Sequence, residues 1–178
     1  MRKIHGAFFM KITNPLFVTS LCILLFLNFG NCNGAITHTN GQNLLLQKLG
    51  QFNDGGKVVT FQIMGDICYL ADWFDGLEII DISDPTSPKE LGQYSTKYAR
   101  GIQIADNVCF LSCNANGLLV LDISDPANPI KIGEYFDGGA AHGLIIKGDI
   151  GYLANWGNGI VILNLTNPYN LVKIGQFN

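Results

Sequence analysis

The sequence predicts an all-β fold made of repeated four-stranded antiparallel units. Three observations lead to this prediction. A segment of about 42 residues recurs along the chain, Asn-Gly and Asp-Gly pairs divide it into short apolar runs, and one of these runs is apolar on both faces. A fixed period of this length is typical of proteins whose supersecondary units stack side by side or form a ring.

The repeat is recognised by its opening residues. Copies begin at Leu49, Leu91 and Ile132, and a further start at Ile174 leads into Gly175–Asn178. The distances between successive starts are 42, 41 and 42 residues. This regularity favours one repeated domain over an assembly of unrelated segments.

Each copy contains four short apolar runs that we expect to be strands. In the second copy these runs are Gly101–Ala105, Val108–Cys113, Gly117–Ile123 and Pro129–Phe136. Asn116 and Gly117 separate the second run from the third, and such pairs supply the positive φ angles of a tight hairpin turn. Asp125 and Pro126 open the connection to the fourth run, where the fixed φ of proline makes a rigid corner.

The third run of each copy decides the architecture. Leu118–Leu121 and Ile160–Leu163 are apolar at every position. A strand with one solvent-exposed face would instead alternate apolar and polar residues. We therefore expect neighbouring sheets to cover both faces, as in the blades of a β-propeller. A β-sandwich is the alternative, but the near-identity of Asp81–Pro85 and Asp122–Pro126 argues against chance repetition.

Two of the copies share an extended motif with a known family. Gly76–Pro88 and Gly117–Pro129 both read Gly-Leu-x-(Ile/Val)-(Ile/Leu)-Asp-Ile-Ser-Asp-Pro-x-x-Pro, and Leu91–Tyr94 adds Leu-Gly-x-Tyr. This motif resembles the LVIVD repeat, and the resemblance covers roughly residues 44–178. The third copy departs from it at Asn164–Pro168. The resemblance implies a β-propeller in an exported bacterial or archaeal protein, and it implies no activity.

Three complete blades predict a partial, open ring, because closed propellers use ~4–8 blades. We expect the blades at about residues 53–94, 95–136 and 137–178. An orphan N-terminal strand, Leu44–Phe52, resembles the last strand of a preceding blade. The terminal blades would expose apolar faces. We therefore expect either self-association that completes the ring or an open arc of low stability.

Residues 1–34 have the pattern of a secretory signal peptide. Arg2, Lys3 and Lys11 precede a run of about a dozen mostly apolar residues, Leu16–Leu27, which small residues follow. The run is shorter than the ~20 residues of a membrane-spanning helix. We therefore expect a secreted or cell-surface protein with a linker at 35–43, and membrane contact only through the signal segment if it stays uncleaved.

The charge balance argues against nucleic acid as a partner. The whole chain has 11 Lys and Arg against 14 Asp and Glu. Residues 1–34 hold three of the basic residues and none of the acidic ones, so eight basic residues face 14 acidic ones in the remainder, a net charge of −6. Phosphate backbones require clustered Lys and Arg, and the sequence contains no such stripe.

One rim of the predicted propeller collects the candidate binding residues. Turns between the second and third strands share this rim with the connections between blades. The candidates are Arg100, His142, Trp73, Trp156, Tyr98, Lys97 and Asn155, with Lys57, Asp72 and Phe74 beside them. Aromatic rings beside Arg, His and Asn suit a protein or a glycan ligand. The alternative is that both Trp residues are packing elements of the repeat.

Arg100 and His142 are stronger candidates than the two Trp residues. They occupy the same position of successive copies, where the first copy has Val59. A position that differs between copies is not fixed by the packing of the repeat.

The sequence predicts no metal site, no cofactor and no catalytic residue. Asp84 and Asp125 are expected to accept hydrogen bonds from their own turns, and Ca²⁺ is the less favoured interpretation. Cys68, Cys109 and Cys113 are expected to be small buried apolar residues without disulfides. A nucleophile elbow and a phosphate-binding loop are both absent from the sequence.

These features favour an exported, non-enzymatic interaction module that binds a protein or a glycan on its rim. One alternative is a hydrolase or lyase in which Arg100 and His142 converge on the central channel. Another is a truncated, nonfunctional fragment.

Overall fold

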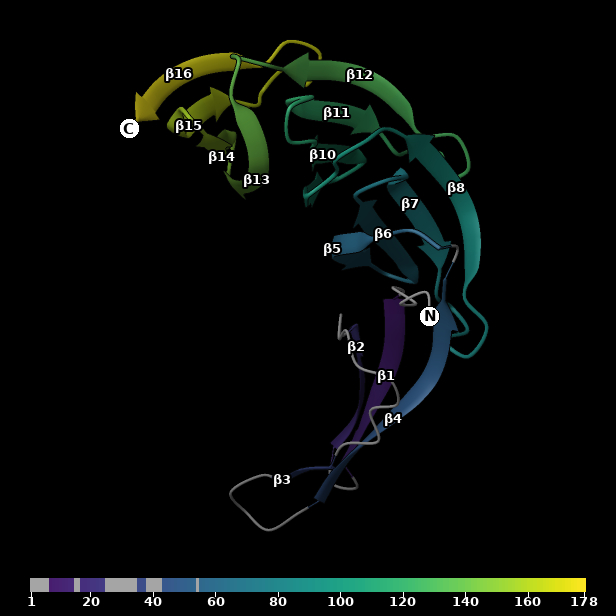
Figure 1. Cartoon of the computed structure of the whole chain (residues 1–178). Helices are drawn as coiled ribbons and strands as arrows, with labels where there is room; N and C mark the ends of the chain where they lie inside the picture. The colour runs from purple at the N-terminus through teal and green to yellow at the C-terminus, as the bar shows by residue number, and fades with distance from the viewer. Residues whose placement is uncertain (1–6, 15–16, 25–34, 38–42, 54) are drawn as a thin grey trace.

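The computed structural model describes residues 7–14, 17–24, 35–37, 43–53 and 55–178, and every regular element in these ranges is a β-strand. Figure 1 shows the strands arranged as an open arc of sheets. Within those ranges, no helix has the length and apolar character needed to cross a membrane. The predicted all-β class is confirmed.

Three four-stranded antiparallel sheets, here called blades 1, 2 and 3, make up the arc. Blade 1 contains β5 (Val58–Met64), β6 (Ile67–Asp72), β7 (Gly76–Asp81) and β8 (Lys89–Ser95). Blade 2 contains β9 (Gly101–Ala105), β10 (Val108–Ser112), β11 (Leu118–Asp122) and β12 (Ile130–Tyr135). Blade 3 contains β13 (Ala140–Lys147), β14 (Ile150–Trp156), β15 (Gly159–Asn164) and β16 (Val172–Phe177).

Each blade is a simple meander whose strands pair in sequence order. The first strands, β5, β9 and β13, line the inner side of the arc, and β8, β12 and β16 form its outer edge (Figure 1). The strands of blade 2 lie within one residue of the predicted bounds. Gly76 and Gly159 begin β7 and β15, and Gly117 directly precedes β11. Their φ angles of 97°, 70° and 77° are the positive values that a hairpin turn requires.

A fourth sheet lies at the N-terminal end and contains the predicted extra strand. It comprises β1 (Ala7–Asn14), β2 (Phe17–Leu24), β3 (Ala35–Thr37) and β4 (Asn43–Phe52), in the order β2-β1-β4-β3. The extra strand is therefore β4, and it is paired on both sides rather than isolated. The expected signal peptide overlaps β1 and β2, and much of it lies outside the described residues; its removal stays a prediction.

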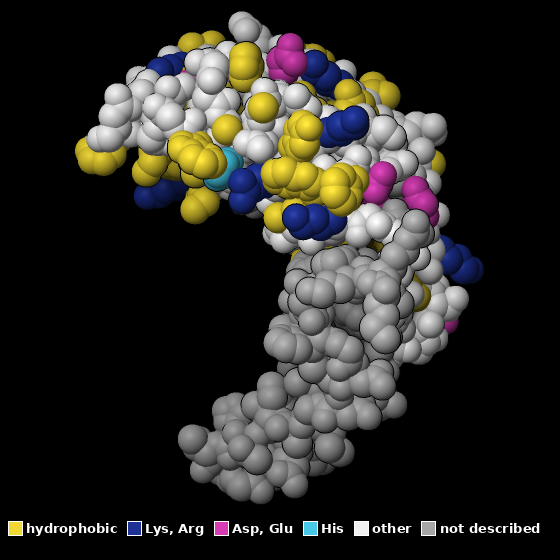
Figure 2. Space-filling model, viewed as in Figure 1, with side chains coloured by type: hydrophobic (Ala, Val, Ile, Leu, Met, Phe, Trp, Pro, Cys, Tyr) yellow, Lys and Arg dark blue, Asp and Glu magenta, His cyan; other side chains and the backbone are white. Residues whose placement is uncertain are grey.

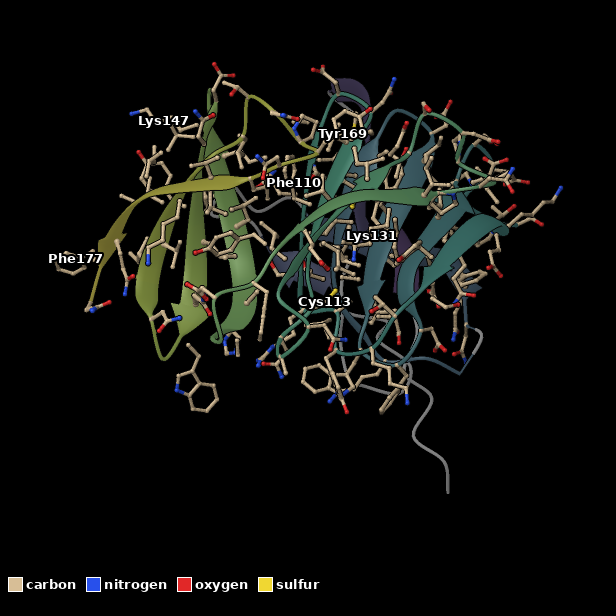
Figure 3. All side chains as sticks on the ribbon, turned by 90° about the horizontal axis from the view of Figure 1, so that it is seen from above. Phe110, Cys113, Lys131, Lys147, Tyr169 and Phe177 are labelled. Atoms are coloured by element: carbon tan, nitrogen blue, oxygen red, sulfur yellow. The ribbon has the colours of Figure 1, made fainter. Side chains whose placement is uncertain are left out.

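The core lies between the blades rather than within any one of them. Blade 1 contributes Tyr69, Ala71, Leu77 and Ile79 to a buried cluster that Cys109, Leu111, Leu121 and Ile123 of blade 2 complete. A second cluster joins blade 2 to blade 3, with Phe110 of β10 in it; Figure 3 shows this side chain near the junction of the two blades. Stacked sheets bury apolar side chains from facing surfaces in this way.

The two-faced burial predicted for the third strands is correct for blades 1 and 2, whereas blade 3 exposes one apolar face, as predicted for a terminal blade. β7 and β11 are buried from their first residue to the residue before the terminal Asp. In β15, Val161 and Leu163 are buried, but Ile160 is 45% exposed. The physical reason is that β7 lies between blade 2 and β4, and β11 lies between blades 1 and 3. Among the described residues, blade 3 has a neighbour on one face only.

Candidate functional site

Backbone hydrogen bonds tie the turn of one blade to the start of the next along one rim. The N–H of Tyr98, in the connection to blade 2, donates to the carbonyl oxygen of Trp73 in the β6–β7 turn at 2.7 Å. Asn114, in the β10–β11 turn, exchanges two backbone hydrogen bonds with Ala141 of β13 at 2.9 and 3.0 Å. Residues that are far apart in the sequence therefore meet on this rim.

The candidate position occupied by Val59, Arg100 and His142 is structurally equivalent in the three blades. Val59 and His142 each lie at an irregularity in the pairing of a first strand with the second strand of its blade. Arg100 immediately precedes β9, and its N–H donates to the carbonyl oxygen of Ser112. A bulge of this kind re-aims a side chain away from the regular faces of the sheet.

Trp73 is the centre of a cation–aromatic cluster. The Lys57 Nζ lies 5.3 Å and the Arg100 Cζ lies 5.5 Å from the centroid of its indole ring. The Tyr98 ring meets the same indole edge-on, with centroids 5.3 Å apart. Tyr98 holds a positive φ of 66°, which is unusual for a residue with a side chain. A cation over an indole face is stabilised by the negative face of the ring.

Arg100 links this cluster to blade 3 through His142. The Arg100 Nη1 lies 3.2 Å from the His142 Nε2. Arginine has only donors, so Nε2 must accept and the proton of the neutral ring must sit on Nδ1. Desolvation and the positive charge of Arg100 both lower the pKa of His142, so the ring is neutral at pH 7.

His142 in turn contacts Trp156, with ring centroids 5.7 Å apart in an edge-on arrangement. A continuous chain of contacts therefore crosses all three blades. We call it the rim ladder, and it consists of Lys57, Trp73, Tyr98, Arg100, His142 and Trp156. Figure 2 shows hydrophobic side chains, Lys and Arg side chains and the histidine gathered on this part of the surface.

The rim ladder is accessible and rich in unneutralised charge. Trp156 is 74% exposed and Tyr98 is 40% exposed. Among the described residues the sole ion pair is Lys131–Glu134, which lies on the outer strand β12. Lys57 and Arg100 therefore have no carboxylate within ion-pair distance in the described part of the chain.

Two of the predicted candidates do not join the rim ladder. Asn155 is 4% exposed, and its side-chain amide donates to Asp137 Oδ1 at 2.6 Å, which fixes the connection into blade 3. Lys97 is exposed, and its backbone carbonyl accepts from Asn116 Nδ2 at 3.3 Å. The structure therefore brings together five of the seven candidates, with Lys57 as the sixth member.

A shallow depression of about 480 Å³ adjoins the Trp156 end of the rim ladder. Its lining includes Asn114, Phe136, Gly138, Gly139 and Trp156. The sequence offered one signal for it, the glycine pair, which removes side chains where the chain enters blade 3. Its volume falls within the range of ligand-binding clefts, ~300–1,000 Å³.

The Asp-Pro corners on the opposite rim use their carboxylates for turn formation, as predicted. Asp84 Oδ1 accepts from the N–H of Thr86 at 2.9 Å and from its hydroxyl at 2.6 Å. Asp125 Oδ1 accepts from the N–H of Ala127 at 3.0 Å. Hydrogen bonds from these neighbours lower the pKa of both carboxyl groups, so the corners are charged at neutral pH.

One further acidic group lies near the rim. Asp72, Asp75 and Glu78 can each bring one oxygen to within 4.8 Å of the others. Asp72 Oδ1 already accepts from the N–H groups of Phe74 and Asp75 at 2.7 and 3.0 Å, which shapes the turn that carries Trp73. We assign no ion to this group.

Cys68, Cys109 and Cys113 are free and buried, as predicted. Burial raises the pKa of the Cys68 and Cys113 thiols to about 12 and raises that of Cys109 as well. Neutral buried thiols are poor nucleophiles. His142 contacts Arg100 and Trp156.

Comparison with known proteins supports the repeat assignment. The LVIVD repeat matches the chain three times in succession, over residues 55–96, 97–137 and 138–178, which is more than half of its length. These limits fall within about two residues of the predicted blades. The search of curated proteins gave no match. The chain therefore belongs to the LVIVD-repeat family.

Proposed function

We propose that the protein is an exported, non-enzymatic interaction module that binds an acidic segment of a protein partner along the rim ladder. The observation that carries the proposal concerns Arg100, whose guanidinium lies over the Trp73 ring and beside His142 but has no carboxylate partner among the described residues. Trp, Tyr and Arg are the residues enriched at the energetic centres of protein interfaces.

Arg100 is prepared for a carboxylate by its surroundings. Guanidinium groups bind carboxylates through two parallel hydrogen bonds, and Arg loses less side-chain freedom on binding when it is already held in place. The Arg100 guanidinium lies over the Trp73 ring, and one of its N–H groups donates to the neutral His142, which leaves further N–H groups for a ligand. Lys57, over the same indole, adds a second positive charge.

The arrangement of aromatic rings supports a peptide more than a compact ligand. Trp73 and Trp156 lie on different blades, with Arg100 and His142 between them. An extended acidic segment can place a carboxylate on Arg100 and apolar side chains on the flanking rings. Export is supported by the N-terminal sequence pattern, in which basic residues precede an apolar run.

Intrinsic fluorescence offers a direct test, because Trp73 and Trp156 are the two Trp residues of the chain and both belong to the rim ladder. Titration with poly-L-glutamate is expected to change the tryptophan emission at low salt and to weaken as salt screens the charges. Poly-L-lysine serves as the charge-reversed control, and dextran sulfate tests an acidic glycan in place of a peptide.

Variants assign the response to the rim ladder. Arg100→Ala is expected to weaken poly-L-glutamate binding about tenfold or more, because charge-assisted hydrogen bonds contribute about 1.5–3 kcal/mol. Lys131→Ala, which removes a cation from the outer strand, is the matched control and should bind like the parent. Equal binding by Arg100→Ala and the parent, or a stronger response to dextran sulfate than to poly-L-glutamate, would contradict the proposal.

A further inference from the structure

Among the described residues, one face of blade 3 is uncovered, and it repeats the face of blade 1 that blade 2 covers. We call this surface the open face, and define it by Ile145, Tyr152, Ala154, Ile160, Ile162, Gly175 and Phe177. The strand registers show that Tyr152 and Ile160 occupy the positions in blade 3 that Tyr69 and Leu77 occupy in blade 1. Tyr69 is 5% exposed and Leu77 fully buried, whereas Tyr152 is 39% and Ile160 45% exposed. Figure 3 shows Phe177 at the free end of the row of blades.

The residues that would cover the open face are present on blade 1. Blade 2 covers blade 1 with Cys109, Leu111, Leu121 and Ile123. The equivalent residues of blade 1 itself, which lie on the side away from blade 2, are Cys68, Leu70, Ile80 and Ile82. Three of the four residues are identical between the two sets, and the fourth exchanges Leu for Ile. The interface between blades 1 and 2 has two surfaces, and each of them has a second copy in the chain. The surface that blade 1 presents recurs on blade 3, and the surface that blade 2 presents recurs on the other side of blade 1.

On each outer strand that a following blade covers, a glycine packs against the Asp-Pro or Asn-Pro turn between the third and fourth strands of that blade, here called its corner. A Cβ on Gly92 of β8 would overlap the carbonyl oxygen of Pro126, and one on Gly133 of β12 would overlap that of Pro168. Gly175 of β16 holds the equivalent position in blade 3. The nearest atom to a Cβ there is the Ile162 Cδ1 of the same blade, at 3.3 Å.

The sequence identifies which corner fits Gly175. Gly50 of β4 receives the corner of blade 1 at Pro85, and its strand reads Gly-Gln-Phe-Asn from Gly50 to Asn53. Gly175–Asn178 has the same four residues in the same order. The corner of blade 1 therefore already packs on a strand whose sequence is identical to that of Gly175–Asn178.

From these observations we propose that blade 1 of a second copy of the chain docks on the open face of blade 3. In the second copy, the corner at Pro85 leaves Gly50 of the same chain and packs on Gly175 of the first copy. The corner thereby exchanges the Gly-Gln-Phe-Asn strand of its own chain for the one in the other chain. The contact is head-to-tail, because two different surfaces meet. Two copies of the three described blades supply six blades, within the ~4–8 that close a propeller. A rotation that fails to close the ring yields a filament.

Sedimentation velocity of the full chain over a range of concentrations tests this proposal. The parent chain is expected to form dimers or longer head-to-tail species. Gly175→Ala is expected to raise the dissociation constant at least about tenfold, because its Cβ would overlap the incoming corner. Its monomer should melt like the parent, since the neighbouring Ile162 methyl group can move.

A second pair of variants keeps the test independent of that glycine. Ile145→Lys places a charge on the open face and should also shift the chain toward monomer, whereas Ile130→Lys, at an exposed Ile of β12, should not. A parent chain that stays monomeric would overturn the proposal. So would association that Gly175→Ala leaves unchanged, since blade 3 would then pair with another blade 3 or associate through a different surface.

Discussion

The faces between the blades and the rim ladder differ in how well the three copies of the repeat agree in sequence. On the faces the copies agree, as in Leu70, Leu111 and Leu153 or in the aromatic series Tyr69, Phe110 and Tyr152. On the rim, Val59, Arg100 and His142 occupy one position with three unrelated side chains. Packing against a neighbouring copy restricts a residue, whereas a rim position is free to serve a ligand. The comparison shows that residues packed between blades agree among the copies, whereas the rim position of Val59, Arg100 and His142 differs in each.

The largest effect is expected where a face is covered. Leu77→Ala should lower the free energy of unfolding by about 2–5 kcal/mol, because it leaves a cavity in the core between blades 1 and 2. Ile160→Ala changes the equivalent position of blade 3 and should cost less than about 1 kcal/mol in the monomer, since the side chain is already partly solvated. Urea unfolding at low protein concentration measures both, and equal losses would remove the distinction between covered and open faces.

A smaller but sharper difference is expected between two glycines of the outer strands. Gly133→Ala should destabilise the chain by about 1–3 kcal/mol, because the new methyl group overlaps the corner at Pro168. Gly175→Ala should leave the melting temperature of the monomer nearly unchanged. Thermal unfolding followed by circular dichroism compares the two. A neutral Gly133→Ala would show that the corners do not sit tightly on these strands.

The rim is expected to tolerate substitution without loss of stability. Arg100→Ala should cost less than about 1 kcal/mol, the range of a partly solvated cation–π contact. Together with the expected loss of poly-L-glutamate binding, this result would separate binding from folding. If Arg100→Ala destabilised the chain as much as Leu77→Ala, the rim ladder would instead be part of the structural core.

The smallest effect concerns the titration of His142. Burial and Arg100 lower its pKa below the ordinary value of 6.5, so the unfolded chain binds the proton more readily than the folded chain. The associated stability is fully present above pH 6.5 and is lost as the pH falls through the folded pKa. Histidine NMR titration should show the lowered pKa, and Arg100→Ala should raise it. A His142 pKa at or above 6.5 in the parent would contradict the contact with Arg100.

Much of the fold was predictable because turn chemistry is local. Asn116 and Gly117 predicted the hairpin between β10 and β11, and the strand bounds followed within a residue. The exposure of Ile160 was not predictable from its own strand, because Ile160–Leu163 is as apolar as Leu118–Leu121. Whether a face is covered depends on a neighbouring sheet, which the residues of the strand do not encode.

The candidate site was predictable in its members but not in its contacts. The repeat placed Arg100, His142 and both Trp residues on one rim. The pairing of Arg100 with Trp73 of the preceding blade and with His142 of the next depends on how the blades stack. Asn155 was indistinguishable in sequence from a surface residue, yet its amide is used inside the blade to hold Asp137.

Hydrogen–deuterium exchange of β11 and β15 compares a covered strand with an open one in the same molecule. At low protein concentration the amides of β15 should exchange faster than those of β11, because local opening is easier where a face lacks a covering blade. Protection of β15 should then rise as the concentration increases and a second copy covers the open face. Equal, concentration-independent protection of the two strands would contradict the claim that coverage by neighbouring blades holds this protein together.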